Sequence, residues 1–247
     1  MLWYMRADLR RISRRIPRLI VLALLYIALT VALVSISRAD VEIAPLMILC
    51  EHYVIGFLPL VIGTIEMAVI LGDDFRAKTM QQAIGRGVSR TRVVLTKLLD
   101  LTVLMLIDIV VFGAVIFAAN GVFRLGMSAD AGRELLLWLL GAWVKSVAYG
   151  SLSLILGFYA QNALFAILAY IALSSGIANK MLGMALGMKA LSALHLGRFL
   201  LSTEIDTLFT HALLGHFDLS ALIVVLLYIA GGAAAAAYLF KNTELEL

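Results

Sequence analysis

Long apolar runs recur along this chain of 247 residues, separated by short polar segments. A helix needs roughly 20 mostly apolar residues to cross the hydrocarbon core of a bilayer. The runs lack the apolar–polar alternation of membrane-spanning strands, so helices must satisfy the backbone hydrogen bonds. The pattern predicts an all-α membrane protein with one transmembrane domain over residues 1–247 and six transmembrane helices. The expected spans are Arg18–Ser37, His52–Leu71, Leu98–Asn120, Glu134–Phe158, Ala163–Asn179 and Leu219–Phe240.

Residues 1–17 have the pattern of an interfacial helix, an amphipathic helix that lies on a membrane surface. Apolar residues recur at three- and four-residue steps, and arginines occupy the other faces. Pro17 is expected to break this helix before the first span. The alternative is a simple cluster of arginines that only directs topology. The apolar positions are Leu2, Met5, Leu9, Ile12 and Ile16, and the arginines are Arg6, Arg10 and Arg14.

Residues 73–97 form the longest polar break flanked by two spans. Within it, Ala77–Ile84 contains no Gly or Pro, which favours a short helix of two turns. Gly85 suits the end of that helix, and Ser89 is expected to cap the N-terminus of the next one. The chain is therefore predicted to leave the membrane, form a short helix along its surface, turn and re-enter. The alternative is a well-capped loop that only connects two spans.

The charge distribution predicts the orientation of the chain. The sequence is 63% hydrophobic, with a mean hydropathy of +1.01 and a pI near 9.3. With six spans, most of the 20 Lys and Arg residues fall on the side of the two termini and of residues 73–97. Cationic residues concentrate on the cytoplasmic side of membrane proteins. We therefore expect a multi-pass protein of the cell (inner) membrane, with both termini in the cytoplasm, a lipid bilayer as its surroundings and no nucleic-acid partner.

Residues 180–218 are expected to form short re-entrant helices on the outer side, between spans five and six. The segment is apolar and rich in Gly and Met, but charges interrupt it too often for a clean span. His211 and His216 are five residues apart, and no carboxylate or cysteine set accompanies them, so no metal site is predicted. Cys50 is the sole cysteine, which excludes an internal disulfide.

Three charged residues fall inside predicted spans, where an unpaired charge is costly. They are Glu66, Asp108 and Lys145. Asp108 and Lys145 lie near the middle of consecutive spans, so we expect them to form an ion pair that stabilises helix packing. The alternative is a polar element of a translocation path, or a proton or cation site. Glu66 has no evident partner at its depth, which leaves both interpretations open for it.

The 73–97 segment resembles the cytoplasmic loop of type-2 ABC exporter permeases. The resemblance rests on Asp74-Phe75, Lys78-Thr79, Gly87-Val88-Ser89-Arg90 and Lys97-Leu98-Leu99, and on the layout of the whole chain. Lys78 departs from the pattern, because the family more often has Gly there. In that family the loop holds a coupling helix that docks on a separate ATPase subunit. The resemblance implies that the residues at or supporting that contact are Asp74, Phe75, Lys78, Thr79, Met80, Ser89 and Arg90.

The chain carries no P-loop, so the resemblance implies a transport subunit without catalytic residues or a cofactor of its own. ATP and Mg would be bound by two partner ABC ATPase subunits, and a second permease chain, identical or related, would complete the path. The implied function is ATP-driven export of an amphipathic substrate such as an antimicrobial peptide, a drug or a lipid-like molecule. The alternative is an ion-coupled secondary transporter, or a sodium-extruding ABC permease that uses Glu66 and Asp108.

Overall fold

The computed structural model describes residues 2–37, 56–76, 79–124, 127–186, 200–216 and 218–243. All regular secondary structure in these ranges is helical, as the apolar pattern predicts. The helices are α1 (Leu2–Ser13), α2 (Ile16–Ser37), α4 (Gly56–Arg76), α5 (Thr79–Gly85), α6 (Arg90–Phe123), α7 (Ala129–Tyr159), α8 (Ala163–Ser174), α9 (Ile177–Leu186), α11 (Leu201–Leu213) and α12 (Leu219–Asn242).

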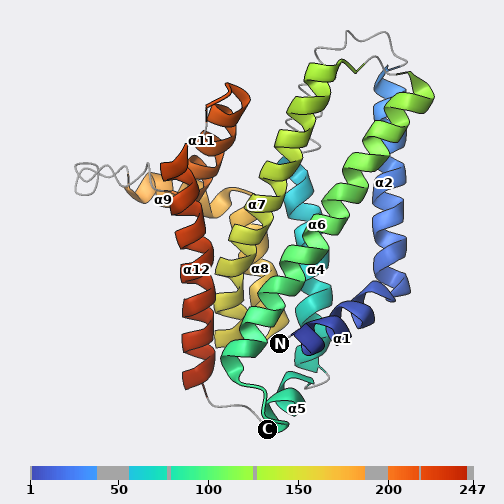
Figure 1. Ribbon diagram of the computed structural model, residues 1–247. Helices are drawn as coiled ribbons and strands as arrows, with labels where there is room; N and C mark the ends of the chain where they lie inside the picture. The colour runs from blue at the N-terminus through green and yellow to red at the C-terminus, as the bar shows by residue number, and fades with distance from the viewer. Residues whose placement is uncertain are drawn as a thin grey trace.

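The long helices form a bundle whose length and composition fit a multi-pass membrane protein. Among the described residues, α6, α7 and α12 are each long and apolar enough to cross a bilayer. Counting the bent pairs α1–α2 and α8–α9 as one span each gives up to five such segments, and α4 contributes a shorter apolar stretch. In Figure 1, α1 and α5 lie together at the lower end of the bundle, and α6 and α7 are connected at its upper end.

The bend between α1 and α2 has the predicted cause. α1 ends at Ser13, and Pro17 is the second residue of α2, where its missing N–H breaks no helical bond. The two helix axes differ in direction by 62°. Figure 1 shows α1 turned across the foot of the bundle. Its place on a membrane surface stays a prediction.

The span predicted over Ala163–Asn179 is not one continuous helix. α8 stops at Ser174, Gly176 adopts a left-handed conformation with φ of 78°, and α9 leaves at 65° to α8. α9 and α11 lie within or next to the predicted re-entrant segment 180–218, while residues 187–199 and the start of the span predicted from His52 lie outside the described residues. α6 begins at Arg90, eight residues before the predicted span, because Ser89 caps it.

α7 is central to the bundle and packs against α4, α6, α8, α11 and α12. Small residues permit the close approach between α7 and α12. A Cβ added to Gly232 would lie 2.8 Å from Ser151 Oγ and 2.9 Å from the Ser151 carbonyl carbon. Small residues at helix crossings are a common way for membrane helices to pack, since lipid provides no hydrophobic drive for helix association. Gly232 is therefore a packing residue.

We predict that Gly232→Ala destabilises the bundle by about 1–3 kcal/mol, because the added methyl meets the backbone of Ser151 and cannot be relieved by a side-chain movement. Gly231→Ala is the matched control. A Cβ at Gly231 meets nothing within 4 Å, so this change should be neutral, or stabilising by up to about 1 kcal/mol from helix propensity. Thermal unfolding of the purified chain in detergent measures both. Equal effects of the two changes would show that the α7–α12 contact is not close.

Candidate functional site

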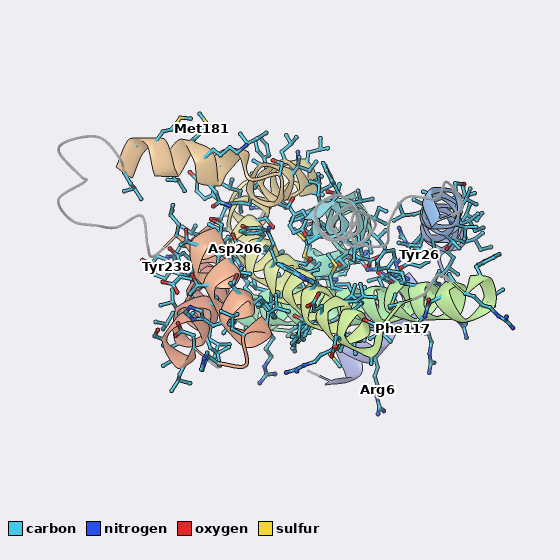
Figure 2. All side chains as sticks on the ribbon, turned by 90° about the horizontal axis from the view of Figure 1, so that it is seen from above. Arg6, Tyr26, Phe117, Met181, Asp206 and Tyr238 are labelled. Atoms are coloured by element: carbon cyan, nitrogen blue, oxygen red, sulfur yellow. The ribbon has the colours of Figure 1, made fainter. Side chains whose placement is uncertain are left out.

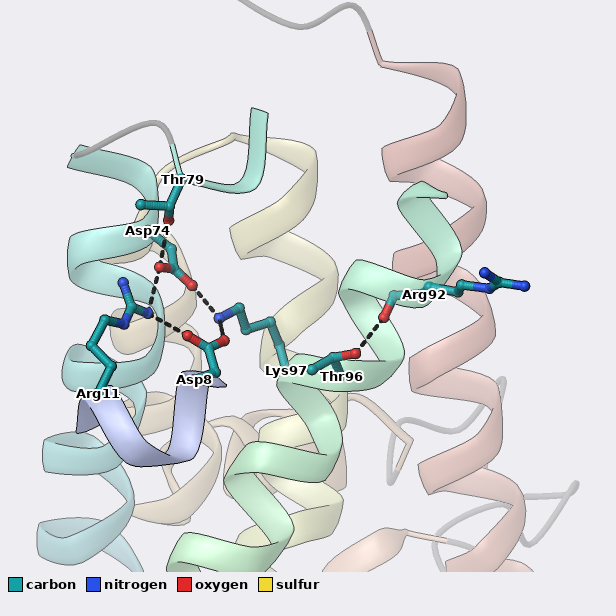
Figure 3. A network of polar contacts seen from close by, with 7 residues as sticks. All are labelled: Asp8, Arg11, Asp74, Thr79, Arg92, Thr96 and Lys97. Carbon is teal, nitrogen blue, oxygen red and sulfur yellow. Dashed lines mark hydrogen bonds and ion pairs between the residues drawn. The ribbon is translucent and has the colours of Figure 1, made fainter. Parts of the chain in front are cut away.

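A cluster of buried charges joins three helices at the end of the bundle that carries α5. Lys97 of α6 is fully buried, and its ammonium contacts the carboxylates of Asp8 on α1 and Asp74 on α4. Arg11 Nη2 of α1 lies 2.7 Å from Asp8 Oδ1 and 2.6 Å from Asp74 Oδ1. Figure 3 shows these four side chains converging. We call Asp8, Arg11, Asp74 and Lys97 the foot cluster.

Asp74 connects the foot cluster to α5. Thr79, the first residue of α5, donates a hydrogen bond from Oγ1 to Asp74 Oδ1 at 2.6 Å. Burial by itself would raise the pKa of Asp74. The ammonium of Lys97, the hydroxyl of Thr79 and the guanidinium of Arg11 outweigh it and hold the pKa of that carboxyl below its ordinary value. Asp74 is therefore an anion that four helices share.

The short helix α5 has a buried side and an exposed side. Met80 is buried against the bundle, while Gln82 and Arg86 are exposed. Gly87 follows with φ of 91°, a left-handed conformation that favours glycine. Ser89 then accepts a hydrogen bond from the backbone N–H of Arg92, which confirms it as the N-cap of α6. α5 is thus held at both ends.

Arg90 caps the C-terminal end of α12. Its Nη1 donates to the carbonyl oxygens of Phe240, Lys241 and Thr243 at 2.9, 3.1 and 2.6 Å. The guanidinium also lies 5.7 Å from the centre of the Phe240 ring. The last carbonyls of a helix have no partner within it, so a cation there is stabilising. Arg90 thereby ties the first turn of α6 to the end of α12.

The seven residues predicted for coupling therefore divide by exposure. Asp74 and Met80 are buried, and Phe75 is half-buried with its ring edge-on to Phe158 at 6.1 Å. Thr79, Ser89 and Arg90 make the bonds described above, and Lys78 lies outside the described residues. Apart from Ser89, which is exposed, the described members of this set are at least partly buried. Among the described side chains of the segment, those that face solvent are Gln82, Arg86, Ser89, Thr91 and Arg92.

A second buried cluster lies between α2, α4 and α6. Arg18 Nε donates to Glu66 Oε1 at 2.6 Å, and Arg18 Nη2 lies 3.0 Å from both oxygens of Asp108. All three side chains are buried. Tyr26 also donates from its hydroxyl to the Asp108 carbonyl oxygen at 3.0 Å. We call Arg18, Glu66 and Asp108 the buried triad.

The buried triad corrects two expectations. The predicted Asp108–Lys145 ion pair is wrong, because Asp108 is paired with Arg18. The Lys145 ammonium instead lies 6.0 Å from the centre of the Tyr149 ring. Glu66, which had no evident partner in sequence, also has Arg18. The triad holds two carboxylates and one guanidinium, and Glu66 Oε2 has no hydrogen-bond partner among the described residues.

Sequence reasoning passed over Asp8, Arg11, Arg18 and Lys97 as site residues. One signal for Asp8 was available, because it is the sole acidic residue among the arginines of α1. Arg18 begins a predicted span, and its position in the sequence does not show that its side chain reaches into the bundle. Among the described residues, no group of three or more His, Cys, Asp or Glu side chains is arranged to hold a metal ion.

Comparison of the chain with protein-family models, with curated proteins and with solved structures found no match. The geometry of the two charged clusters and of α5 therefore carries the functional argument that follows.

We predict that Arg18→Met destabilises the protein by about 3–5 kcal/mol, because it leaves two carboxylates buried without a cation. Asp108→Asn should partly rescue that variant, so the pair is non-additive. The matched control is Lys145→Met with Asp108→Asn, whose losses should simply add. Thermal unfolding in detergent of the single and double variants measures this. Additivity for Arg18 and Asp108 would contradict the triad.

We predict that Asp8→Asn releases α1 while the bundle stays folded, since Lys97 keeps Asp74 as a partner. Hydrogen bonds to charged groups contribute about 1.5–3 kcal/mol, so tryptic cleavage after the α1 arginines should accelerate by at least about tenfold. Asp130→Asn, an exposed change at the other end of the bundle, is the control. Unchanged cleavage in Asp8→Asn would show that this contact does not hold α1.

The pKa of Asp74 predicts how its contribution to the protection of α1 in this assay varies with pH. The pKa of Asp74 is lower in the folded state than in the unfolded chain. Its contribution is therefore complete above the ordinary carboxyl pKa of about 3.9 and is lost only as pH falls through the lower folded value. The contribution of Asp74 to the protection of α1 should therefore stay constant from about pH 8 to about pH 5.

Proposed function

We propose that this chain is the permease subunit of an ATP-driven exporter in the cell (inner) membrane. Two separate ABC ATPase subunits bind ATP and Mg, and a second permease chain, identical or related, completes the path. The substrate is amphipathic, in the class of antimicrobial peptides, drugs or lipid-like molecules. The observation that carries the proposal is the bracing of α5. A helix of seven residues outside the long spans is fastened to the bundle through one shared carboxylate.

A coupling helix must transmit force, so it needs rigid connections to the helices that move. α5 begins at Thr79, which is bonded to Asp74, and Asp74 contacts α1 and α6 through Arg11 and Lys97. Met80 anchors the first turn of α5 in the core, and Ser89 fixes the start of α6. A push on α5 therefore reaches α1, α4 and α6 together. A loop that only connected two spans would not need this bracing.

The surface offered to the motor is polar and basic. Gln82 and Arg86 are exposed on α5 and on the turn after it, and Arg92 is exposed on the first turn of α6. We expect an acidic or polar cleft on the ATPase to receive this surface, because charge complementarity guides association. Met80 and Phe75 lie underneath and support it.

The proposed layout has six spans with both termini in the cytoplasm. They are α2, α4, α6, α7, α8 with its bent continuation α9, and α12, while α1 lies on the cytoplasmic surface. α9 and α11 would close the outer end of the path. The distribution of Lys and Arg supports this orientation, since the basic residues of α1 and of the α5 region lie at the same end of the bundle.

The buried triad favours a second candidate function, an ion-coupled transporter or a sodium-extruding permease. Two carboxylates share one guanidinium, and Glu66 Oε2 has no hydrogen-bond partner among the described residues. An inorganic cation could balance the remaining charge. Against this, Arg18 already fills the space between the carboxylates with a cation of its own. We therefore place the exporter of amphipathic molecules first.

We predict that the chain, purified by affinity from its native membrane, brings with it an ATPase that contains a P-loop. Gln82→Glu with Arg86→Glu should reduce the recovered ATPase at least about tenfold, because the surface loses its positive charge and repels an acidic cleft. Arg133→Glu, an exposed change at the opposite end of the bundle, is the control. Substitution of Met80 is unsuitable, since its side chain is buried.

Two outcomes would contradict the proposal. If no ATPase accompanies the unaltered chain, the motor-driven function is wrong. If the double variant retains the ATPase, the docking surface lies elsewhere. Sodium stimulation of ATP hydrolysis that is lost in Glu66→Gln would favour the sodium-extruding alternative.

A further inference from the structure

An apolar groove of about 220 Å³ runs along the outside of the bundle between α6 and α7. Its floor forms at a close contact of the two helices, since Leu139 Cδ1 lies 2.8 Å from where a Cβ on Gly113 would be. Its walls include exposed side chains such as Val110, Ala114 and Leu140. Trp143, which lines the groove, is fixed by a hydrogen bond from its indole Nε1 to the Thr102 carbonyl oxygen at 3.0 Å.

The length of the groove matches one leaflet of a bilayer. On α6 its lining runs from Leu106 to Phe117, which is about 16 Å at 1.5 Å per residue. Half of the hydrocarbon core is about 15 Å thick. The stripe of lining residues on α6 advances by three or four positions, so it follows one face of the helix. The groove is therefore long enough for one acyl chain lying along the helices.

Two arginines stand beyond the end of the groove that is remote from α5. Arg124 is the C-cap residue that follows α6, seven residues after Phe117, and it has a left-handed conformation with φ of 53°. Arg133 is one turn of α7 before Leu136, which also lines the groove. Both side chains are exposed, and neither has a hydrogen bond or an ion pair among the described residues. Phe117, labelled in Figure 2, is the last residue of α6 that lines the groove at this end.

One of the two acidic residues nearby lies on another face of α7. Glu134 and Asp130 are exposed on α7, but helical geometry puts Glu134 on the side of α7 away from Leu136 and Leu140. Both arginines also lie just outside the apolar stretches of their helices, at the depth where lipid headgroups begin. The positive charge at the groove mouth is therefore available to an anionic headgroup.

We infer that the α6–α7 groove binds an anionic phospholipid, with one acyl chain between α6 and α7 and the phosphate between Arg124 and Arg133. The apolar lining supplies no polar partner along the groove, which suits a hydrocarbon chain, and the two guanidinium groups match the phosphate. The inference requires that α6 and α7 span a bilayer. It does not depend on the ATPase or on the transported substrate.

Quenching of Trp143 fluorescence by brominated lipid tests the inference. Trp3→Phe and Trp138→Phe leave Trp143, at one end of the groove lining, as the only tryptophan. The protein is placed in phosphatidylcholine vesicles containing phosphatidylglycerol brominated in the distal half of its acyl chains. We expect preferential quenching by this lipid over equally brominated phosphatidylcholine. Each arginine should contribute about fivefold to the relative binding constant.

Two pairs of variants separate the headgroup contact from the acyl-chain contact. Arg124→Gln with Arg133→Gln should reduce binding of phosphatidylglycerol to the level of phosphatidylcholine, while Arg6→Gln with Arg14→Gln at the other end of the bundle should not. Ala114→Phe fills the groove and should reduce quenching by both lipids. Ala118→Phe, one turn further along α6 and equally exposed but not part of the groove lining, is the matched control.

Three results would overturn the inference. The first is equal quenching by the two brominated lipids in the unaltered protein. The second is a preference that survives loss of both arginines. The third is the absence of quenching by either lipid, which would mean that another protein segment covers the groove.

Discussion

The contact of Lys97 with Asp74 is the interaction on which the foot cluster and the attachment of α5 depend. An ammonium that is fully buried requires carboxylates around it, and it obtains them from α1 and α4. Asp74 in turn holds Thr79 at the start of α5. Loss of this pair would leave an uncompensated charge inside the bundle and would separate α5 from the helices that it is proposed to move.

The two charged clusters together explain how the N-terminal helices are attached. Glu66 and Asp74 lie about 12 Å apart along α4, and Lys97 and Asp108 lie about 16 Å apart along α6. Their partners Asp8, Arg11 and Arg18 all come from α1 and α2. Most of the apolar side chains of α2 are exposed, and Leu22 is its main apolar contribution to the core. Charged contacts, more than apolar packing, therefore fasten α1 and α2.

The remainder of the bundle is packed in a different manner. α7 lies against α12 through small residues such as Gly232 and Ser151, with backbones in close approach. Arg90 then fixes the end of α12 to the start of α6. The core helices are thus joined by close packing, and the peripheral pair α1 and α2 is joined by buried ions. The peripheral pair carries the ionisable groups, so it is the part of the molecule whose attachment can be altered by changing single charges.

The sequence alone determined the helical class, the approximate ends of most long helices and several local features. Bilayer thickness sets the length of an apolar run. Pro17 cannot continue α1, and Ser89 caps α6 by accepting a hydrogen bond from the nearby backbone N–H of Arg92. Only the tertiary structure decided which charges meet. The sequence predicts how deep in the membrane a charged residue lies. Whether two charges at the same depth meet also depends on how each helix is rotated about its axis, which the sequence does not give. Asp108 and Lys145 have similar depths on consecutive helices, yet Asp108 is turned toward Arg18 and Lys145 toward Tyr149. The same limit applies to Met80 and Arg90. The burial of Met80 and the contact of Arg90 with the end of α12 depend on tertiary packing, which no local pattern in the sequence records.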